Sequence, residues 1–113
     1  MATVQITFTD ASTNEESFNI YRSNDGAPAT VTGSNLVSQL AWDGSAWQAS
    51  QGALSNNSVT IESGSSTASP STPGQTFILR YNETNSGNFK YGVTAANAIG
   101  SSSITNSGTA VSL

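Results

Sequence analysis

The segment centred on residue 92 alternates between apolar and small or polar side chains. Phe89, Tyr91, Val93 and Ala95 occupy every second position of it. Because successive side chains of a β-strand point to opposite faces, this spacing predicts a strand with one face in a core and the other toward water. The chain is therefore expected to build a sheet that covers one side of an apolar core.

The same alternation recurs along the chain. Further apolar stripes are expected at Val4, Ile6 and Phe8, at Phe18 and Ile20, at Val59 and Ile61, at Phe77, Leu79 and Tyr81, and at Val111 and Leu113. Residues 36–42 are less regular and predict one strand with an irregularity. No segment of useful length has the helical period, so we expect an all-β protein with seven to eight strands spaced as in an antiparallel β-sandwich.

Two connections carry clear local signals. Asp43 and Gly44 predict a hairpin, whose loop length is left open. A two-residue loop would place Trp42 opposite Ser45, and a four-residue loop would place Trp42 opposite Trp47. Residues 64–74 are small or polar around two prolines and predict an exposed loop.

Three segments resemble the fibronectin type III family. Residues 91–100 read YGVTAANAIG and resemble its strand F signature, Y-x-V-x-A-x-N-x-x-G. Residues 6–10, ITFTD, and residues 17–26, SFNIYRSNDG, resemble strands B and C of bacterial and phage members. The resemblance implies an immunoglobulin-like β-sandwich, with residues 1–113 as a single domain.

The sequence departs from that family at three places. Phe8 stands where the family usually has a core Trp. Phe89 stands where the family has a tyrosine corner, so the bond of that hydroxyl is absent or is replaced through Tyr91 or Tyr81. Only five residues precede Ile6, so strand A is expected to be atypical or missing. Either the middle region fills its place, or the sheet has an exposed edge that invites another chain to add a strand.

Charge and hydropathy argue against two kinds of partner. The net charge is -4, and only Arg22, Arg80 and Lys90 are positive. This pattern provides no basic stripe to neutralise phosphates, so we expect no nucleic-acid partner. No segment approaches the roughly 20 apolar residues that span a bilayer, so we expect no membrane partner.

Catalysis is not expected either. The chain has no His and no Cys, which removes the commonest general base, the thiol nucleophile and thiolate metal ligands. The carboxylates are expected in turns or at exposed strand positions; they belong to Asp10, Glu15, Glu16, Asp25, Asp43, Glu62 and Glu83. Asp10, Asn14, Glu15 and Glu16 offer oxygen ligands, but their spacing matches no calcium loop. We therefore assign no catalytic, cofactor or metal site.

Four aromatic residues are the candidates for an interface or a ligand site: Trp42, Trp47, Tyr21 and Tyr81. Together they could form a platform on which sugar rings stack. In the other interpretation, one Trp covers the core and the second covers the hairpin or a subunit contact. The sequence leaves open whether the Trp side chains are buried or exposed.

The expected function is structural and adhesive, without enzymatic activity. Charged residues make up 9% of the chain, and a surface rich in Ser, Thr, Asn and Gly suits a secreted or virion β protein. We expect a homo-oligomer, a partner of a capsid or tail protein, or both, at the surface of a phage virion. It would act as a capsid decoration, cement or tail-associated protein that binds by strand edges and apolar patches. The alternative is an extracellular carbohydrate-binding or spacer module of a secreted bacterial enzyme, with a glycan as ligand.

Overall fold

The computed structural model of the chain describes residues 2–10, 15–29, 35–52, 59–97, 99, 105–106 and 111–112. Its elements are the strands β1 (Ala2–Asp10), β2 (Ser17–Ser23), β3 (Leu36–Trp42), β4 (Trp47–Gln51), β5 (Val59–Ile61), β6 (Gln75–Glu83), β7 (Asn88–Ala96), β8 (Thr105–Asn106) and β9 (Val111–Ser112). The all-β class is confirmed. Within the described ranges, no helix has the length and apolarity needed to cross a membrane.

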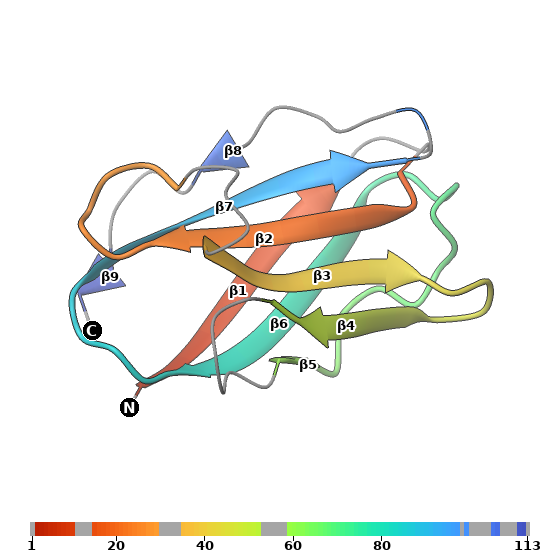
Figure 1. Cartoon of the computed structure of the whole chain (residues 1–113). Coiled ribbons are helices and arrows are strands. Elements are labelled where there is room, and N and C mark those ends of the chain that lie inside the picture. The colour runs from red at the N-terminus through yellow and green to blue at the C-terminus, as the bar shows by residue number, and fades with distance from the viewer. Residues whose placement is uncertain are drawn as a thin grey trace.

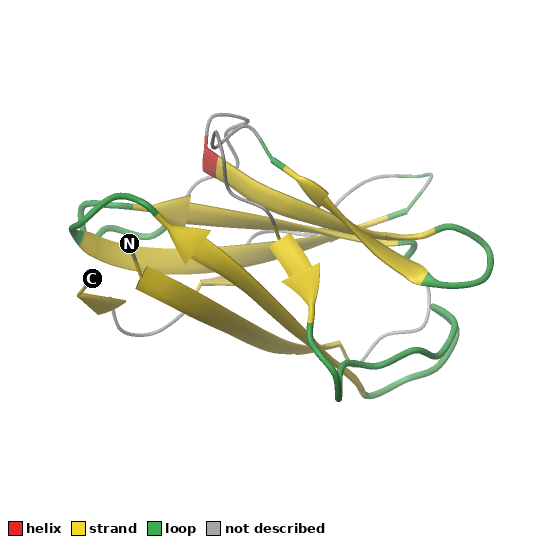
Figure 2. Cartoon of the chain, turned by 90° about the horizontal axis from the view of Figure 1, so that it is seen from below, coloured by secondary structure: helices red, strands yellow, loops and turns green. Residues whose placement is uncertain are grey.

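The strands form two antiparallel layers. One sheet has the order β1-β6-β5, and the other has the order β4-β3-β2-β7. β8 and β9 pair with separate parts of β7, on residues 92–93 and 88–89 respectively. In Figure 1, β1 and β6 run diagonally behind β2, β3 and β7, and Figure 2 shows the two layers from below. The arrangement is that of a β-sandwich.

The core lies between these layers and is built from the alternating apolar residues. Its fully buried apolar side chains are Ile20, Val37, Leu40, Phe77, Leu79 and Phe89. Phe18 packs between the layers, with its ring centroid 5.2 Å from those of both Phe8 and Phe77. Phe8 therefore fills part of the core, as the sequence predicts for that position.

β1 is a long strand that is paired on one side. It matches β6 in a continuous register from Ala2↔Glu83 to Asp10↔Gln75. β5, the described strand of the region between β4 and β6, pairs with the opposite side of β6. Among the described residues, no strand pairs with the other side of β1. The described strand of the middle region, β5, therefore does not take the place beside β1.

The irregularity predicted in residues 36–42 is a bulge. Ile20 pairs with Ser38, but Tyr21 pairs with Leu36, so Val37 is an extra residue in β3. Val37 and Ser38 are both fully buried despite being neighbours. The bulge explains why the apolar residues of this strand break the two-residue period.

The hairpin between β3 and β4 has the longer of the two predicted loops, since Trp42 pairs with Trp47. Asp43 closes the loop: its Oδ1 accepts hydrogen bonds from the backbone N–H of Ser45 at 2.9 Å and of Ala46 at 2.8 Å. These bonds favour the carboxylate and lower the pKa of Asp43. Gly44 has φ of 106°, a conformation that other residues rarely adopt.

The segment 64–74 is a loop, as predicted, and none of its residues is buried, but it is not exposed throughout. Gln75 is 4% exposed, and its Nε2 donates to the carbonyl oxygens of Ser69 at 2.8 Å and Thr72 at 3.0 Å. The hydroxyl of Ser66 donates to Oε1 of the same amide. These bonds hold parts of the loop against the sheet, where several of its residues are half-buried. A loop without large apolar residues can pack against the sheet in this way because the buried side-chain amide of Gln75 binds two of its carbonyl oxygens.

The last predicted strand, at residues 109–113, corresponds to β9, whereas β8 was not predicted. The inward orientation expected for Val111 and Leu113 lies outside the described side chains. Ser112 of β9 pairs with Asn88, and Ala2 of β1 pairs with Glu83. The first and last described strands therefore meet the two sides of one turn, residues 84–87, at the same end of the molecule (Figure 1).

Candidate functional site

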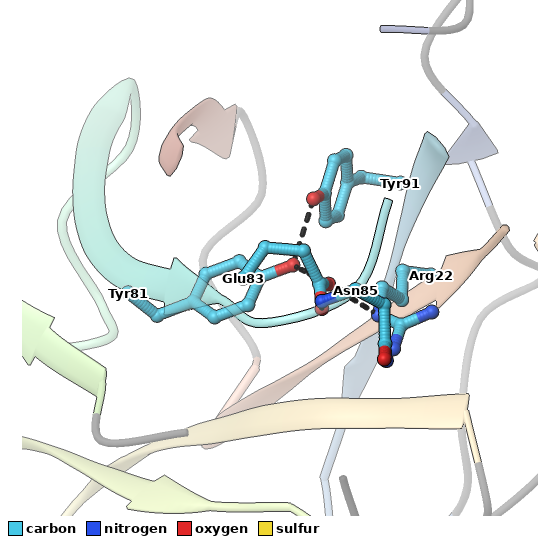
Figure 3. A network of polar contacts seen from close by, with 5 residues as sticks. All are labelled: Arg22, Tyr81, Glu83, Asn85 and Tyr91. Carbon is cyan, nitrogen blue, oxygen red and sulfur yellow. Dashed lines mark hydrogen bonds and ion pairs between the residues drawn. The ribbon is translucent and has the colours of Figure 1, made fainter. Parts of the chain in front are cut away.

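A cluster of polar side chains lies inside the sandwich (Figure 3). Glu83 at the end of β6 is fully buried, and Arg22 of β2 is 5% exposed. The Arg22 Nε lies 2.6 Å from the Glu83 Oε1. This Nε–H is not aligned for a hydrogen bond, so the contact is an ion pair. Since the two residues belong to different sheets, the pair joins the layers.

Two tyrosine hydroxyls extend this cluster. The Tyr81 hydroxyl donates to Glu83 Oε1 at 2.9 Å and lies 2.7 Å from the Tyr91 hydroxyl. The backbone N–H of Asn85 donates to the other carboxylate oxygen of Glu83 at 3.2 Å. Burial is the main cause that raises the pKa of both tyrosines. We call Arg22, Tyr81, Glu83, Asn85 and Tyr91 the inter-sheet network.

The strand registers explain why these residues meet. Tyr81 and Glu83 are two positions apart on β6 and share its inward face. Arg22 pairs directly with Tyr91 across β2 and β7. The guanidinium carbon of Arg22 also lies 5.0 Å from the centre of the Phe89 ring, a geometry that favours a cation. Phe89 stands at the position of the expected tyrosine corner and has no hydroxyl. Close to it, the contact between the hydroxyls of Tyr81 and Tyr91 connects β6 with β7.

The inter-sheet network is suited to holding the sheets together. Both oxygens of the Glu83 carboxylate are engaged, one by Arg22 and Tyr81 and the other by Asn85. A buried carboxylate that is paired and hydrogen-bonded avoids most of the cost of burial. The expectation that Glu83 is exposed or lies in a turn was wrong. The signal missed in the sequence is that Glu83 continues the apolar period of Phe77, Leu79 and Tyr81.

The other carboxylates occupy mostly peripheral positions. Asp25 accepts a hydrogen bond from the backbone N–H of Ala27 at 3.1 Å, and Glu62 pairs with Arg80 at 2.7 Å near the surface. Glu15 is buried. Asn14, one of the four residues considered for calcium, lies outside the described residues. The described portion of the chain contains no group of three or more acidic residues placed to hold a metal ion.

The four candidate aromatic residues do not form one exposed platform. Trp42 and Trp47 do meet, with ring centroids 5.5 Å apart in an edge-to-face arrangement. Trp47 is 7% exposed, packs 4.9 Å from the Phe77 ring, and donates its indole N–H to the carbonyl oxygen of Ala68 at 2.8 Å. Tyr21 and Tyr81 are buried as well. Trp42 alone of the four is only partly buried.

The side of β1 with which no described strand pairs is the second candidate site, and we call it the β1 edge. The outward side chains beside it are exposed and uncharged: Thr3, Gln5, Thr7 and Thr9. The inward residues Val4 and Phe8 are only half-buried. Their partners on β6, Tyr81 and Phe77, are 2% and 0% exposed. The core is therefore less well covered at β1 than at the neighbouring strand.

The structure thus defines a small two-sheet β protein with a polar network across its core and an open strand edge. Comparison of the chain with protein-family models, with curated proteins and with solved structures finds no significant match.

Proposed function

We propose that this chain is a fibronectin type III-like domain in which no described strand takes the place of the family's first strand. The pairing order supports an immunoglobulin-like sandwich, because β1-β6-β5 follows the order B-E-D and β4-β3-β2-β7 follows C″-C′-C-F. The segments that resemble strands B, C and F fall on β1, β2 and β7. β8 and β9 occupy the place of strand G beside β7. The β1 edge then lies where strand A would pair.

The function we propose is structural and adhesive. The chain would be a phage virion protein, either a capsid decoration or cement protein or a tail-associated one, that binds by strand edges and apolar patches. The observation that carries this proposal is the β1 edge: among the described residues, this nine-residue strand is paired on one side only, and it lies beside an incompletely covered core. An added strand gains backbone hydrogen bonds there, and Val4 and Phe8 gain apolar contact. Repetition on a particle lattice then amplifies a modest affinity.

Quantitative mass spectrometry of density-purified virions from the source of the sequence tests this function. We expect peptides of this chain in the particle fraction, at a copy number proportional to that of a capsid or tail protein. Recombinant protein should rebind particles from which it has been stripped, and the variant Gln5→Lys/Thr7→Lys should rebind less. Thr60→Lys, at an exposed position of β5, is the matched control. Recovery of the chain only outside the particles would overturn the proposal.

The second candidate function is glycan binding by a module of a secreted bacterial enzyme. Trp42, which is partly buried, and the exposed Asp43 that follows it in the chain support it, since a ring can stack on a sugar while an acid orients its hydroxyls. The test is binding to a panel of immobilised polysaccharides, with Trp42→Ala and Asp43→Asn as variants. Binding that both variants abolish would favour this function. Trp47→Ala is less informative because that side chain belongs to the core.

A further inference from the structure

We propose that a second copy of this chain occupies the β1 edge, with the two β1 strands antiparallel about a two-fold axis at Ile6. This proposal rests on the adhesive function proposed above and names the partner of the same edge. It would join two three-stranded sheets into one continuous sheet through an isologous contact.

The first argument is that the other described sheet edges are short or interrupted. β5 has three residues, β4 has five, and the strands on the outer side of β7 have two each. β1 has nine residues and pairs with β6 without a register shift. It contains no proline or lysine, and its single charge, Asp10, lies at its end. Natural edge strands usually contain prolines, charged residues or bulges that prevent pairing with other chains. A long edge without them favours pairing with another strand.

The second argument is that the strand is complementary to itself. With Ile6 on the axis, Thr3 faces Thr9 and Gln5 faces Thr7 on the outer side. Val4 faces Phe8 on the core side, and Asp10 faces Ala2, so no like charges meet. A shift of one residue would place apolar side chains opposite polar ones. The apolar and polar faces therefore restrict the pairing to registers like this one.

The third argument comes from the core. Val4 and Phe8 are half-buried although their partners on β6 are buried. In the proposed dimer, Val4 of each copy lies beside Phe8 of the other, so both gain apolar cover. The exposed remainder of these two side chains is the surface that a neighbouring strand would bury.

Disulfide trapping tests the register, because the chain has no cysteine of its own. The single variants Gln5→Cys and Thr7→Cys are mixed under mild oxidation, and the products are weighed intact. Facing positions of antiparallel strands have Cα atoms about 4.5–5.5 Å apart, within the range that a disulfide bridges. Random pairing of equal amounts would already give about twice as much mixed disulfide as of each symmetric one, so we expect the mixed disulfide to exceed each symmetric one by much more than this ratio. Thr60→Cys on β5 is the control and should cross-link only at the level of random collision.

Sedimentation measures the assembly itself. The unmodified chain should sediment as a dimer at micromolar concentration, Gln5→Lys/Thr7→Lys as a folded monomer, and Thr60→Lys as a dimer. A monomeric unmodified chain would overturn the proposal, as would a dimer that gives no excess of the mixed disulfide over random pairing. Circular dichroism checks the fold of each variant, and the cysteine experiment stands even if the lysine variant unfolds.

These outcomes separate the two proposals. A monomer that still binds virions would remove the β1 dimer and leave the virion function. A dimer with the expected disulfide, absent from virions, would do the reverse.

Discussion

The side chains of Arg22 and Glu83 form an ion pair across the two sheets, with 2.6 Å between Nε and Oε1 and with both residues buried. Arg22 comes from β2 and Glu83 from the end of β6. Because apolar contacts are not directional, a core of aliphatic and aromatic groups alone specifies sheet alignment less sharply than a polar pair does. The inter-sheet network therefore fixes how the layers meet at this end of the sandwich.

Removal of one partner of this pair should be strongly destabilising. We expect Arg22→Met to lower the free energy of unfolding by about 3–5 kcal/mol, because it leaves the Glu83 carboxylate buried without its cation. The double variant Arg22→Met/Glu83→Leu should recover part of this loss. Arg80→Met is the matched control: its pair with Glu62 is 49% and 24% exposed, so the cost should stay within about 1 kcal/mol. Equal losses in urea denaturation for the two arginine variants would contradict the structural role of the buried pair.

The two network tyrosines predict a loss of stability at alkaline pH. Burial raises the pKa of Tyr81 and of Tyr91 in the folded chain, whereas an unfolded tyrosine titrates near about pH 10. Below that pH both states keep the phenolic protons and stability is unaffected by them. Above it the unfolded chain binds fewer protons than the folded chain, so the free energy of unfolding falls as the pH rises.

Tyrosinate absorbance checks this prediction. At about pH 11 the folded chain should exceed the variant Tyr81→Phe/Tyr91→Phe in tyrosinate absorbance by less than it does in denaturant, because burial raises the pKa of both tyrosines in the folded chain. In denaturant at the same pH, the unsubstituted chain should absorb more, by two tyrosinates. The difference in tyrosinate absorbance between the chain and the variant could instead be the same in the folded and unfolded states. That result would show that the network does not protect these hydroxyls.

The two tryptophans should differ in their contribution to stability. Trp47→Ala removes a ring that packs on Phe77 and an indole N–H bonded to Ala68, so we expect a cost of about 3–5 kcal/mol. Trp42→Ala removes a half-buried ring and should cost no more than about 2 kcal/mol. Trp47→Phe keeps an aromatic ring and isolates the lost hydrogen bond and volume. Chemical denaturation measures all three, and a larger effect at Trp42 would contradict this packing.

Gly52 should not tolerate a side chain. A Cβ built there would lie 2.0 Å from the carbonyl oxygen of Leu36, so β3 or the segment after β4 must move. We expect Gly52→Ala to lower the free energy of unfolding by about 1–3 kcal/mol or more. Gly74→Ala is the comparison, because its Cβ would meet nothing within 4 Å and only its φ of 72° is unfavourable. A thermal unfolding midpoint lower for Gly74→Ala than for Gly52→Ala would contradict the close approach.

Much of the architecture could be predicted because its strands have one buried face. Phe18 and Ile20, or Phe77 and Leu79, repeat at two residues, and burial of one face leaves few other registers. The hairpin loop remained open in the sequence because Asp43 and Gly44 suit both loop lengths. The side chain of Asp43 decides for the longer one by binding the N–H groups of Ser45 and Ala46.

The inter-sheet network could not be predicted in the same way. A charged residue is usually exposed. Glu83 was therefore expected in a turn or at an exposed position, and no partner was expected for Arg22. Their pairing depends on the alignment of the two sheets, which no local pattern specifies. Strand β8 escaped prediction because two residues are too few to show a period. The contacts of the loop at residues 64–74 were not predicted because Gln75, the buried residue that binds two of its carbonyl oxygens, is itself polar.

Ala2 and Ser112 pair with Glu83 and Asn88, on the two sides of the turn at residues 84–87. A polypeptide that entered at β1 and left after β9 would therefore pass through one pole of the sandwich. Such a unit can be inserted into a loop of a host protein, or circularly permuted, with little disturbance of the sheets. If the domain is attached at that pole, the hairpin that carries Trp42 and Trp47 lies at the opposite end, far from the attachment (Figure 1). The domain would then project from its host protein and would not connect two neighbouring domains in a linear chain.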